Sequence, residues 1–425
     1  MADKLRVGVI GAGRWSATAH LPGFTRSPLC EIVMLCDLDP EVGEARAKEF
    51  GIPEFTTDFE KVLAREDIDV VDVVTRADHQ DMVFATLEAG KHCLVEKPVC
   101  HDFRDVLKAQ ALAESKGLKT KVGLTFRYAP AVQYMFELVR EGFIGDPFVF
   151  NGYEQNSQWL DPDNPMDKRI HRVPPEGEPD WGTDPTPEGI VVSSLEGYGA
   201  PTIDIGLECV GSDLTSVVGM LANMVPYRRR TNLDEDRERI NIDDADMFMA
   251  RAGNGALFSL QSSYVTVGNY PGIEARIFGS EGAIQVRLVE EFGVIQTIKT
   301  ATPDAVEFVE REIPPEYFPP GARPDDHWST AFYGNLVHNF CQEILGERTE
   351  DQGDFAQSAR VQEIINAATL SHRERRWVDL PLPGDLEMPA AQTMPWGRNA
   401  SRSSEPGTRK AERSNELMTL SPPGM

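Results

Sequence analysis

The chain has 425 residues, ordinary apolar and charged fractions, and a formal net charge of −26 at pH 7. This length predicts two domains with sizeable cores, and the negative charge argues against nucleic acid or an anionic membrane as a partner. The sequence has no long apolar run that predicts a membrane span, and no signal peptide is expected before the first strand. The six cysteines show neither C-x-x-C pairing nor zinc spacing. We therefore expect a cytoplasmic protein with reduced thiols and no metal site.

The first predicted elements are a β-branched strand at 7–10, a glycine turn, and a helix over 14–25. A short run of this kind is typical of a buried parallel strand. Gly11 permits the tight turn, and Gly13 lets the backbone approach a pyrophosphate at the positive end of the helix. Ser16 replaces the usual third glycine and is small enough for close packing. The turn residues expected to bind a nucleotide are Gly11, Gly13, Arg14 and Trp15.

A second apolar run, 31–36, ends at Asp37. Asp37 follows Gly13 at close to the spacing of about 20 residues expected for the carboxylate that binds the adenosine ribose. The alternative is a loop carboxylate that caps the next helix, predicted at 40–50. Because strand, turn, helix and acid occur in order, we favour a nucleotide site. A carboxylate repels a 2′-phosphate and Leu38 brings no compensating charge, so NAD is predicted rather than NADP.

Strands and helices continue to alternate up to residue 125. The further strands are predicted at 68–75, 92–96 and 121–124, and the further helices at 57–64, 79–89 and 103–116. This alternation predicts a doubly wound parallel sheet and an NAD-binding domain over residues 1–125. Thr75 and His79 are expected to contact the nucleotide, His79 by shaping its loop rather than by catalysis.

The pattern changes after residue 126, where one helix at 127–141 precedes a series of strands. These strands are predicted at 147–153, 215–221, 247–251, 256–264, 273–278, 283–288 and 294–299, with closing helices at 333–345 and 354–372. Successive strands with short turns predict an antiparallel sheet, so residues 126–383 are expected to form an α+β domain for substrate binding and oligomerisation.

Two stretches do not fit a compact core. Residues 156–188 are rich in Pro, Asp and Gly and are too long for an ordinary connection, which predicts an active-site or interface loop. Residues 384–425 are poor in aliphatic side chains and predict an extended or disordered tail.

Lys97 stands between Glu96 and Pro98 at the carboxyl end of the strand predicted at 92–96. Ligands of an open parallel sheet bind at that edge. An ammonium there can hydrogen-bond a substrate hydroxyl and favour its alkoxide character while hydride leaves the same carbon. Taken alone, a lysine beside a loop proline is more often a surface residue.

Several stretches together resemble the Gfo/Idh/MocA oxidoreductase family, over roughly residues 4–383. They are the glycine turn with Asp37, the Thr75 to His79 loop, residues 90–98 ending in Glu96-Lys97-Pro98, Arg127-Tyr128 with a nearby proline, the turn at 279–282, and residues 377–381. The resemblance implies an N-terminal Rossmann domain and a C-terminal domain with a large, mostly antiparallel sheet, through which homodimers or homotetramers form. It also implies pyridine-nucleotide oxidation or reduction of a sugar, cyclitol or related polyol.

The resemblance places the catalytic lysine of the family at Lys97 and its partner near the nicotinamide at Glu96. The family element D-x-G-x-H matches residues 204–208, but Glu208 replaces its histidine. In the family the Asp orients and the His exchanges a proton with the substrate, so Asp204 and Glu208 are the expected counterparts. On a helix the two carboxylates face the same way. Glu208 could act as a base if burial or Asp204 raised its pKa, or the carboxylates and the lysine could form a structural ion network.

The remaining candidates for substrate contact are polar or aromatic. His171, in the long loop, could supply an imidazole from a lid, although isolated loop histidines are more often solvated. Gln155, Trp159, Trp181 and Tyr198 flank this region, where packing of the loop onto the sheet is an equal alternative. The expected substrate-binding residues are Lys97, Arg127, Tyr128, Tyr153, His171 and Asp204.

The sequence therefore predicts an NAD-dependent oxidoreductase that transfers hydride between the nicotinamide and a secondary hydroxyl of a sugar, glycoside or cyclitol, in either direction. One alternative is a glycosidase that retains NAD, oxidises its sugar transiently and releases it with no net NADH. Another is a nucleotide-bound sensor without activity, against which the retention of Lys97 and Asp204 argues.

Overall fold

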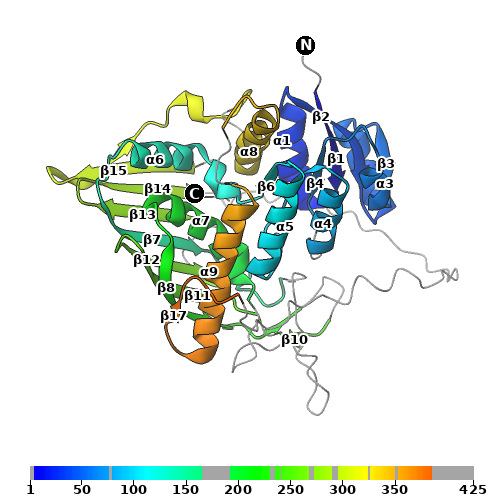
Figure 1. The fold of residues 1–425 in the computed structure, drawn as a ribbon. Coiled ribbons are helices and arrows are strands. Elements are labelled where there is room, and N and C mark those ends of the chain that lie inside the picture. Colours follow the sequence, from blue (N-terminus) through cyan, green and yellow to red (C-terminus); the bar gives the residue numbers. More distant parts are fainter. Residues whose placement is uncertain are drawn as a thin grey trace, which may run out of the picture. The chain divides into compact units, whose positions relative to one another are not determined.

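The N-terminal part of the chain forms a six-stranded sheet in the computed structural model, with strand order β3-β2-β1-β4-β5-β6 (Figure 1). All its neighbouring strands are parallel. The strands are β1 (Leu5–Ile10), β2 (Cys30–Cys36), β3 (Glu54–Thr56), β4 (Val70–Val73), β5 (His92–Val95) and β6 (Thr120–Val122). The predicted doubly wound parallel sheet is confirmed, and β3 is a strand that the sequence analysis did not predict.

The structure describes residues 4–75, 79–164, 192–229, 235–240, 242–267, 272–289, 295–323, 326–349 and 353–384. The predicted tail and most of the predicted long loop therefore lie outside the described residues. Within these ranges no helix combines the length and apolar character needed to cross a membrane.

Helices flank the parallel sheet where the sequence predicts them. They are η1 (Ser16–His20), α1 (Leu21–Arg26), α2 (Pro40–Phe50), α3 (Phe59–Leu63), α4 (Gln80–Glu88) and α5 (Phe103–Ser115). Asp39, Asp58 and Asp102 begin α2, α3 and α5 by accepting backbone N–H bonds of the first turn. These local caps explain why the predicted helix starts agree closely with the structure.

The second part of the chain contains a nine-stranded sheet with order β16-β15-β14-β13-β7-β12-β11-β8-β17. Its strands are β7 (Pro147–Gln155), β8 (Leu214–Ala222), β11 (Ala245–Ala252), β12 (Leu257–Ser263), β13 (Glu274–Gly279), β14 (Ala283–Val289), β15 (Ile295–Thr302), β16 (Ala305–Arg311) and β17 (Val378–Asp379). Only the β7–β12 pair is parallel among the described neighbours, so the expectation of a mostly antiparallel sheet is confirmed. A small hairpin joins β9 (Tyr227–Arg228) and β10 (Glu238–Arg239).

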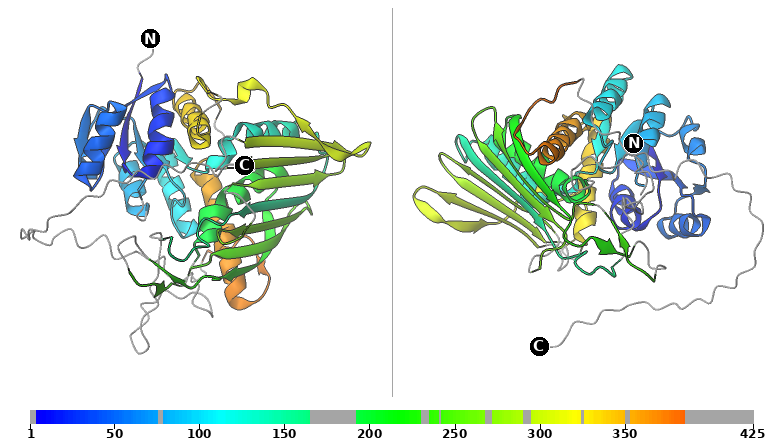
Figure 2. Two further views of the ribbon diagram at one scale, coloured as in Figure 1. Left: turned by 180° about the vertical axis from the view of Figure 1, so that it is seen from behind. Right: turned by 90° about the horizontal axis from the view of Figure 1, so that it is seen from below.

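Helices cover one face of this sheet (Figure 2). They include α6 (Pro130–Arg140), η3 (Leu195–Gly199), α7 (Ala200–Val210) and α9 (Phe355–Glu374). The other helices of this part of the chain are η2 (Thr125–Tyr128), η4 (Pro315–Tyr317) and α8 (Trp328–Ile344). Helix α7 packs closely on β7 and β12, because a Cβ at Gly206 would lie 2.3 Å from the Phe258 ring. Helix α9 contacts both β8 and α5, so it joins the two sheets' helical layers.

Helix α8 packs against the parallel sheet of the N-terminal part of the chain. It belongs to the C-terminal part in sequence, yet Tyr333, Val337 and Phe340 share a hydrophobic core with Val7 and Val9 of β1. The half-buried Arg26 guanidinium reaches across to Asp326, just before α8, with Nη2 2.8 Å from Oδ1. Helix α8 is therefore joined to α1 and β1 by both apolar packing and an ion pair.

Candidate active site

The glycine turn after β1 leaves room for a nucleotide. Gly11 has a φ of 116°, and a Cβ there would lie 2.4 Å from the carbonyl oxygen of Val74, so a side chain cannot be accommodated. At Gly13, by contrast, no heavy atom lies within 4 Å of a Cβ position. The buried hydroxyl oxygens of Ser16 and Thr75 have no hydrogen-bond partner among the described residues. Open backbone and unpaired hydroxyls at a helix start are what a dinucleotide pyrophosphate requires.

Asp37 is held against the same turn. Its Oδ2 accepts the backbone N–H of Ala12 at 2.6 Å, and its Oδ1 accepts that of Asp39 at 2.9 Å. The carboxylate is therefore fixed at the end of β2, where it can meet ribose hydroxyls. The helix cap predicted as its alternative role belongs to Asp39 instead.

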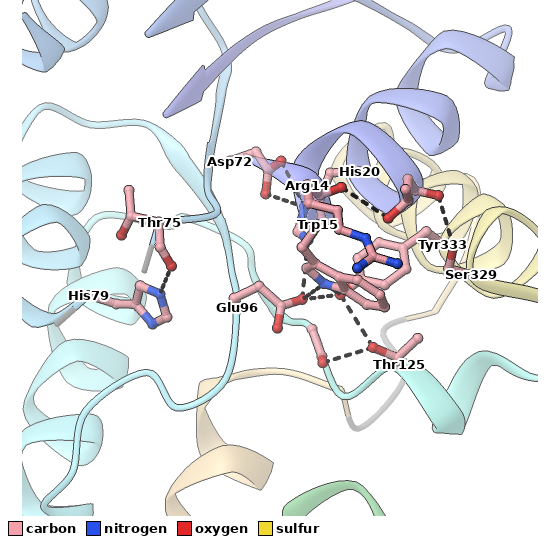
Figure 3. A network of polar contacts seen from close by, with 12 residues as sticks. Arg14, Trp15, His20, Asp72, Thr75, His79, Glu96, Thr125, Ser329 and Tyr333 are labelled. Atoms are coloured by element: carbon pink, nitrogen blue, oxygen red, sulfur yellow. Dashed lines mark hydrogen bonds and ion pairs between the residues drawn. The ribbon is translucent and has the colours of Figure 1, made fainter. Parts of the chain in front are cut away.

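His79 connects the loops that follow β4 and β5. One ring nitrogen, Nε2, lies 3.1 Å from the carbonyl oxygen of Thr75, and Nδ1 lies 2.8 Å from that of Pro98 (Figure 3). The histidine thus links the loop after β4 to the Lys97 segment, and its expected contact with a nucleotide stays a prediction.

A polar network surrounds Glu96; we call Trp15, His20, Asp72, Glu96 and Tyr333 the Glu96 cluster (Figure 3). Three groups donate hydrogen bonds to Glu96 Oε1: the Trp15 indole at 3.0 Å, His20 Nε2 at 3.1 Å and the Tyr333 hydroxyl. His20 Nδ1 lies 2.8 Å from Asp72 Oδ2. The cluster therefore joins the glycine turn, β4, the end of β5 and α8.

Burial and charge decide the protonation of this cluster. Burial disfavours the charged imidazole, but Asp72 and Glu96 more than offset it and raise the pKa of His20 from 6.5 to about 9. Burial likewise opposes ionisation of Glu96, but His20, Lys97 and Tyr333 lower its pKa to about 2. Burial raises the pKa of Asp72, against the attraction of His20. Near neutral pH the cluster thus contains an imidazolium and an ionised Glu96.

Lys97 directly follows Glu96 at the carboxyl end of β5 and is half-buried. It makes no hydrogen bond or ion pair with any residue that the structure describes. Its ammonium is therefore available to a bound molecule, whereas Glu96 is firmly held.

A second buried network surrounds Arg127; we call Arg127, Asp204, Glu208 and Gln357 the Arg127 cluster. Arg127 donates from Nε to Asp204 Oδ2 at 2.9 Å and from Nη2 to Asp204 Oδ1 at 3.0 Å. Nη2 also lies 3.2 Å from Glu208 Oε2, and Gln357 Nε2 donates to Asp204 Oδ1 at 2.7 Å. One guanidinium thus binds both carboxylates of the D-x-G-x-E element.

The two carboxylates differ in exposure. The Asp204 side chain is fully buried, whereas that of Glu208 is 17% exposed. Burial raises the pKa of Asp204, and Arg127 with Gln357 oppose that shift. Asp204 is therefore suited to hold Arg127 in place, and Glu208 is the carboxylate that a substrate could reach. The two carboxylates thus form an ion network with Arg127, whereas the network considered from the sequence had Lys97 as its cation.

The structure does not bring all the predicted residues together. Tyr128 is fully buried in the core beneath β1. Tyr153 lies on the sheet face opposite Gly152, which packs on Thr202 of α7. The rings of Trp159 and Tyr198 pack against Tyr264 at centroid distances of 5.4 and 5.6 Å and lie 6.1 Å from each other. His171 and Trp181 lie outside the described residues.

The sequence analysis did not identify His20, Asp72, Tyr333 and Gln357 as members of the site. Asp72 carried a usable signal, because a carboxylate inside a buried β-branched strand needs a partner. A further unpredicted contact links the Lys97 segment to η3: His101 Nδ1 lies 2.9 Å from Glu196 Oε1.

A nucleotide-binding parallel sheet joined to a large mixed sheet, with a lysine at the carboxyl edge, defines a dinucleotide-dependent oxidoreductase. Comparison with family models agrees: residues 5–124 match the model "oxidoreductase family, NAD-binding Rossmann fold" of Gfo/Idh/MocA proteins, and residues 132–285 match the Gfo/Idh/MocA C-terminal domain. The chain belongs to the Gfo/Idh/MocA family of oxidoreductases. The predictions of family, fold class, enzyme class and NAD as cofactor are thereby confirmed.

Several relatives are dehydrogenases of sugars or cyclitols. Levoglucosan dehydrogenase of Pseudarthrobacter phenanthrenivorans is 26% identical over 66% of this chain and 73% of that protein. D-apiose dehydrogenase of Paraburkholderia graminis is 33% identical over 34% of this chain and 39% of that protein. The NAD(+) scyllo-inositol 2-dehydrogenase of Bacillus subtilis is 30% identical over 37% and 46%. These names give the glycosidase alternative no support.

A solved structure of levoglucosan dehydrogenase in complex with NADH has the same fold. It superposes with a TM-score of 0.74 at 23% identity and covers 89% of this chain and all of that protein. An oxidoreductase domain protein from Kribbella flavida superposes with a TM-score of 0.73 at 25% identity and similar coverage.

Proposed function

We propose that the protein is an NAD-dependent dehydrogenase acting on a secondary hydroxyl of a sugar, glycoside or cyclitol, or the reductase of the corresponding ketone. The observation that carries this proposal is the arrangement at the end of β5. There Lys97 has no partner in the described part of the chain, next to a Glu96 anchored to the glycine turn through Trp15.

The side chains divide the work of the reaction. Bound NAD supplies the hydride acceptor, held by the turn at Gly11 and Gly13 and by Asp37 on the ribose. The Lys97 ammonium hydrogen-bonds the reacting oxygen and stabilises its developing negative charge. Glu208 takes the hydroxyl proton, while Asp204 fixes Arg127 beside it. Oxidation thus breaks one C–H and one O–H bond and leaves a ketone.

Turnover of polyols tests this proposal. Purified protein is supplied with NAD and with levoglucosan, D-apiose, scyllo-inositol, other free polyols and aryl glycosides, while NADH absorbance is followed. We expect lasting growth of NADH with at least one free polyol. Aglycone release without NADH would instead establish the NAD-retaining glycosidase, and nucleotide binding without turnover of any compound would favour the sensor.

We also propose that the protein works in the cytoplasm as a homodimer or homotetramer that pairs through the outer face of the nine-stranded sheet. Met220, Met247 and Met249 are 60%, 46% and 59% exposed on that face, and Met247 lies opposite Met220 across β11 and β8. Apolar exposure of this kind is typical of an interface. Light scattering should give a multiple of the chain mass, reduced by Met247→Lys with Met249→Lys. A monomeric parent protein would contradict this proposal.

A further inference from the structure

His20 is a fully buried imidazole that the mechanism above does not use. Its Nδ1 lies 3.0 and 2.8 Å from the two oxygens of Asp72, and its Nε2 lies 3.1 Å from Glu96 Oε1 (Figure 3). The ionised Glu96 only accepts hydrogen bonds, so Nε2 donates to it. Because Asp72 and Glu96 together raise the pKa of His20 to about 9, the ring is an imidazolium near neutral pH.

The groups around His20 come from separate elements of the fold. Asp72 lies on β4, Glu96 follows β5, and Tyr333 lies on α8 with its ring centroid 4.4 Å from the imidazole. The Tyr333 hydroxyl donates to the same Glu96 oxygen as His20. Through these contacts the imidazolium fixes Glu96 relative to β4, β5 and α8.

This arrangement determines the surroundings of Lys97. Glu96 Oε1 has three donors, while Oε2 has no hydrogen bond to any residue in the described ranges. Because Glu96 precedes Lys97, a fixed Glu96 also fixes the backbone from which the lysine extends. The imidazolium moreover pairs with Glu96, the carboxylate whose charge acts on Lys97.

We propose that His20 is a positioning residue for Lys97: it holds Glu96 in one orientation and offsets carboxylate charge that would otherwise draw the ammonium away from the reacting hydroxyl. This inference rests on the proposed role of Lys97 in hydride transfer. His20 acts through Glu96 and does not touch the substrate.

The variant His20→Gln tests the proposal, because glutamine keeps an N–H donor and loses the charge. The matched control is His92→Gln. His92 is the first residue of β5, and its Nδ1 accepts the backbone N–H of Lys119 at 2.9 Å. We expect His20→Gln to lower kcat by about 10- to 100-fold, since small displacements of a reacting group have effects of this order. The KM of the polyol and the Kd of NADH should change by less than about threefold.

A role confined to folding would lower the melting temperature but leave kcat per NADH-binding site unchanged. His20→Gln protein that binds NADH and turns over at the parental kcat would therefore overturn the proposal. We expect His92→Gln to behave like the parent protein in both measurements.

A second measurement needs no substrate. Acetic anhydride acylates unprotonated lysines, and peptide mass spectrometry gives the rate at Lys97 in the nucleotide-free protein. We expect slower acylation in His20→Gln by roughly threefold to tenfold, because the uncompensated Glu96 charge attracts the Lys97 side chain and holds it against the carboxylate. Lys108, whose side chain is 69% exposed, is the internal reference. Unchanged acylation of Lys97 would count against the proposal, whereas a parent protein without polyol turnover would count against the proposed function alone.

Tyr333→Phe covers the case in which His20→Gln does not fold. It removes one donor from Glu96 Oε1 and leaves both carboxylate contacts of His20 in place. We expect a smaller fall in kcat, of about threefold to tenfold. Folded Tyr333→Phe protein with parental kcat would overturn the proposal, because it would show that holding Glu96 in one orientation does not position Lys97.

Discussion

In both the Glu96 cluster and the Arg127 cluster a buried cation lies between two carboxylates, but the cation differs. In the first, the buried His20 lies between Asp72 and Glu96; in the second, the buried Arg127 lies between Asp204 and Glu208. A guanidinium stays charged at every pH at which a protein is folded, whereas an imidazole carries charge only where its surroundings favour it. The Arg127 cluster is therefore a permanent ion network, and the Glu96 cluster is one whose charge depends on pH.

The clusters also differ in what adjoins them. Beside the Glu96 cluster stands Lys97, which has no partner in the described part of the chain. In the Arg127 cluster, the side chain that a substrate could reach is Glu208, and Glu208 is ion-paired with Arg127. We therefore expect a larger catalytic effect from Lys97, beside the Glu96 cluster, than from Glu208.

The largest effect is expected at Lys97. Lys97→Met should lower kcat by about 1,000-fold or more, because it removes the group that stabilises charge on the reacting oxygen. NADH binding, measured by fluorescence, should stay near the parental value, and Lys108→Met serves as the control. A Lys97→Met protein with more than about a tenth of the parental kcat would mean that the Glu96 cluster adjoins no catalytic group.

Arg127→Met should lower the free energy of unfolding by about 3 to 5 kcal/mol, since it leaves the buried Asp204 and the partly buried Glu208 without their cation. Urea unfolding measures this change. The control is Arg46→Met, which breaks the surface pair with Glu49 and should cost less than about 1 kcal/mol. Equal losses in the two variants would contradict the description of the Arg127 cluster as a buried ion network.

Glu208→Gln distinguishes a proton acceptor from an ion-pair partner. We expect kcat to fall by about 100-fold with little change in KM, as for loss of a general base. Glu137→Gln, on an exposed pair with Arg140, is the control. If kcat falls by less than about threefold, Glu208 serves only Arg127 and another group accepts the proton.

The two buried cations, His20 and Arg127, should contribute differently to the pH dependence of stability. The pKa of His20 is raised in the folded state from 6.5 to about 9, so its contribution is complete below pH 6.5 and is lost as the pH rises through 9. The free energy of unfolding should thus fall by about 1.4 kcal/mol per pH unit between these values. In His20→Gln this slope should disappear, while Arg127→Lys should keep it. An identical slope in His20→Gln and the parent would show that His20 does not carry the charge.

Much of the N-terminal domain could be predicted because its signals are local. The run at 7–10, the turn at Gly11 and Gly13, and the caps Asp39 and Asp58 each act within a few residues. Helix α2 begins and ends at the predicted residues, 40 and 50. The Glu96-Lys97-Pro98 triplet likewise stands at the predicted strand end, since a parallel strand brings its carboxyl end to the ligand edge.

The partners of buried charges could not be predicted in the same way. Glu96 meets Tyr333, and Asp204 meets Gln357, across separations of 237 and 153 residues. Nothing local to either carboxylate indicates such a partner. Strand alternation similarly predicts that Gly152 and Tyr153 face opposite sides, but not which side α7 covers.

The sequence by itself determined most of the elements, the glycine turn, the place of Asp37 at the end of the second strand and the position of Lys97 along the chain. Only the tertiary structure decided that α8 packs against β1, that His20 lies between two carboxylates, and that Arg127 holds Asp204 and Glu208 together. The physical reason is that backbone preferences depend on neighbouring residues, whereas a buried charge is stabilised by whichever group the packed fold brings to it.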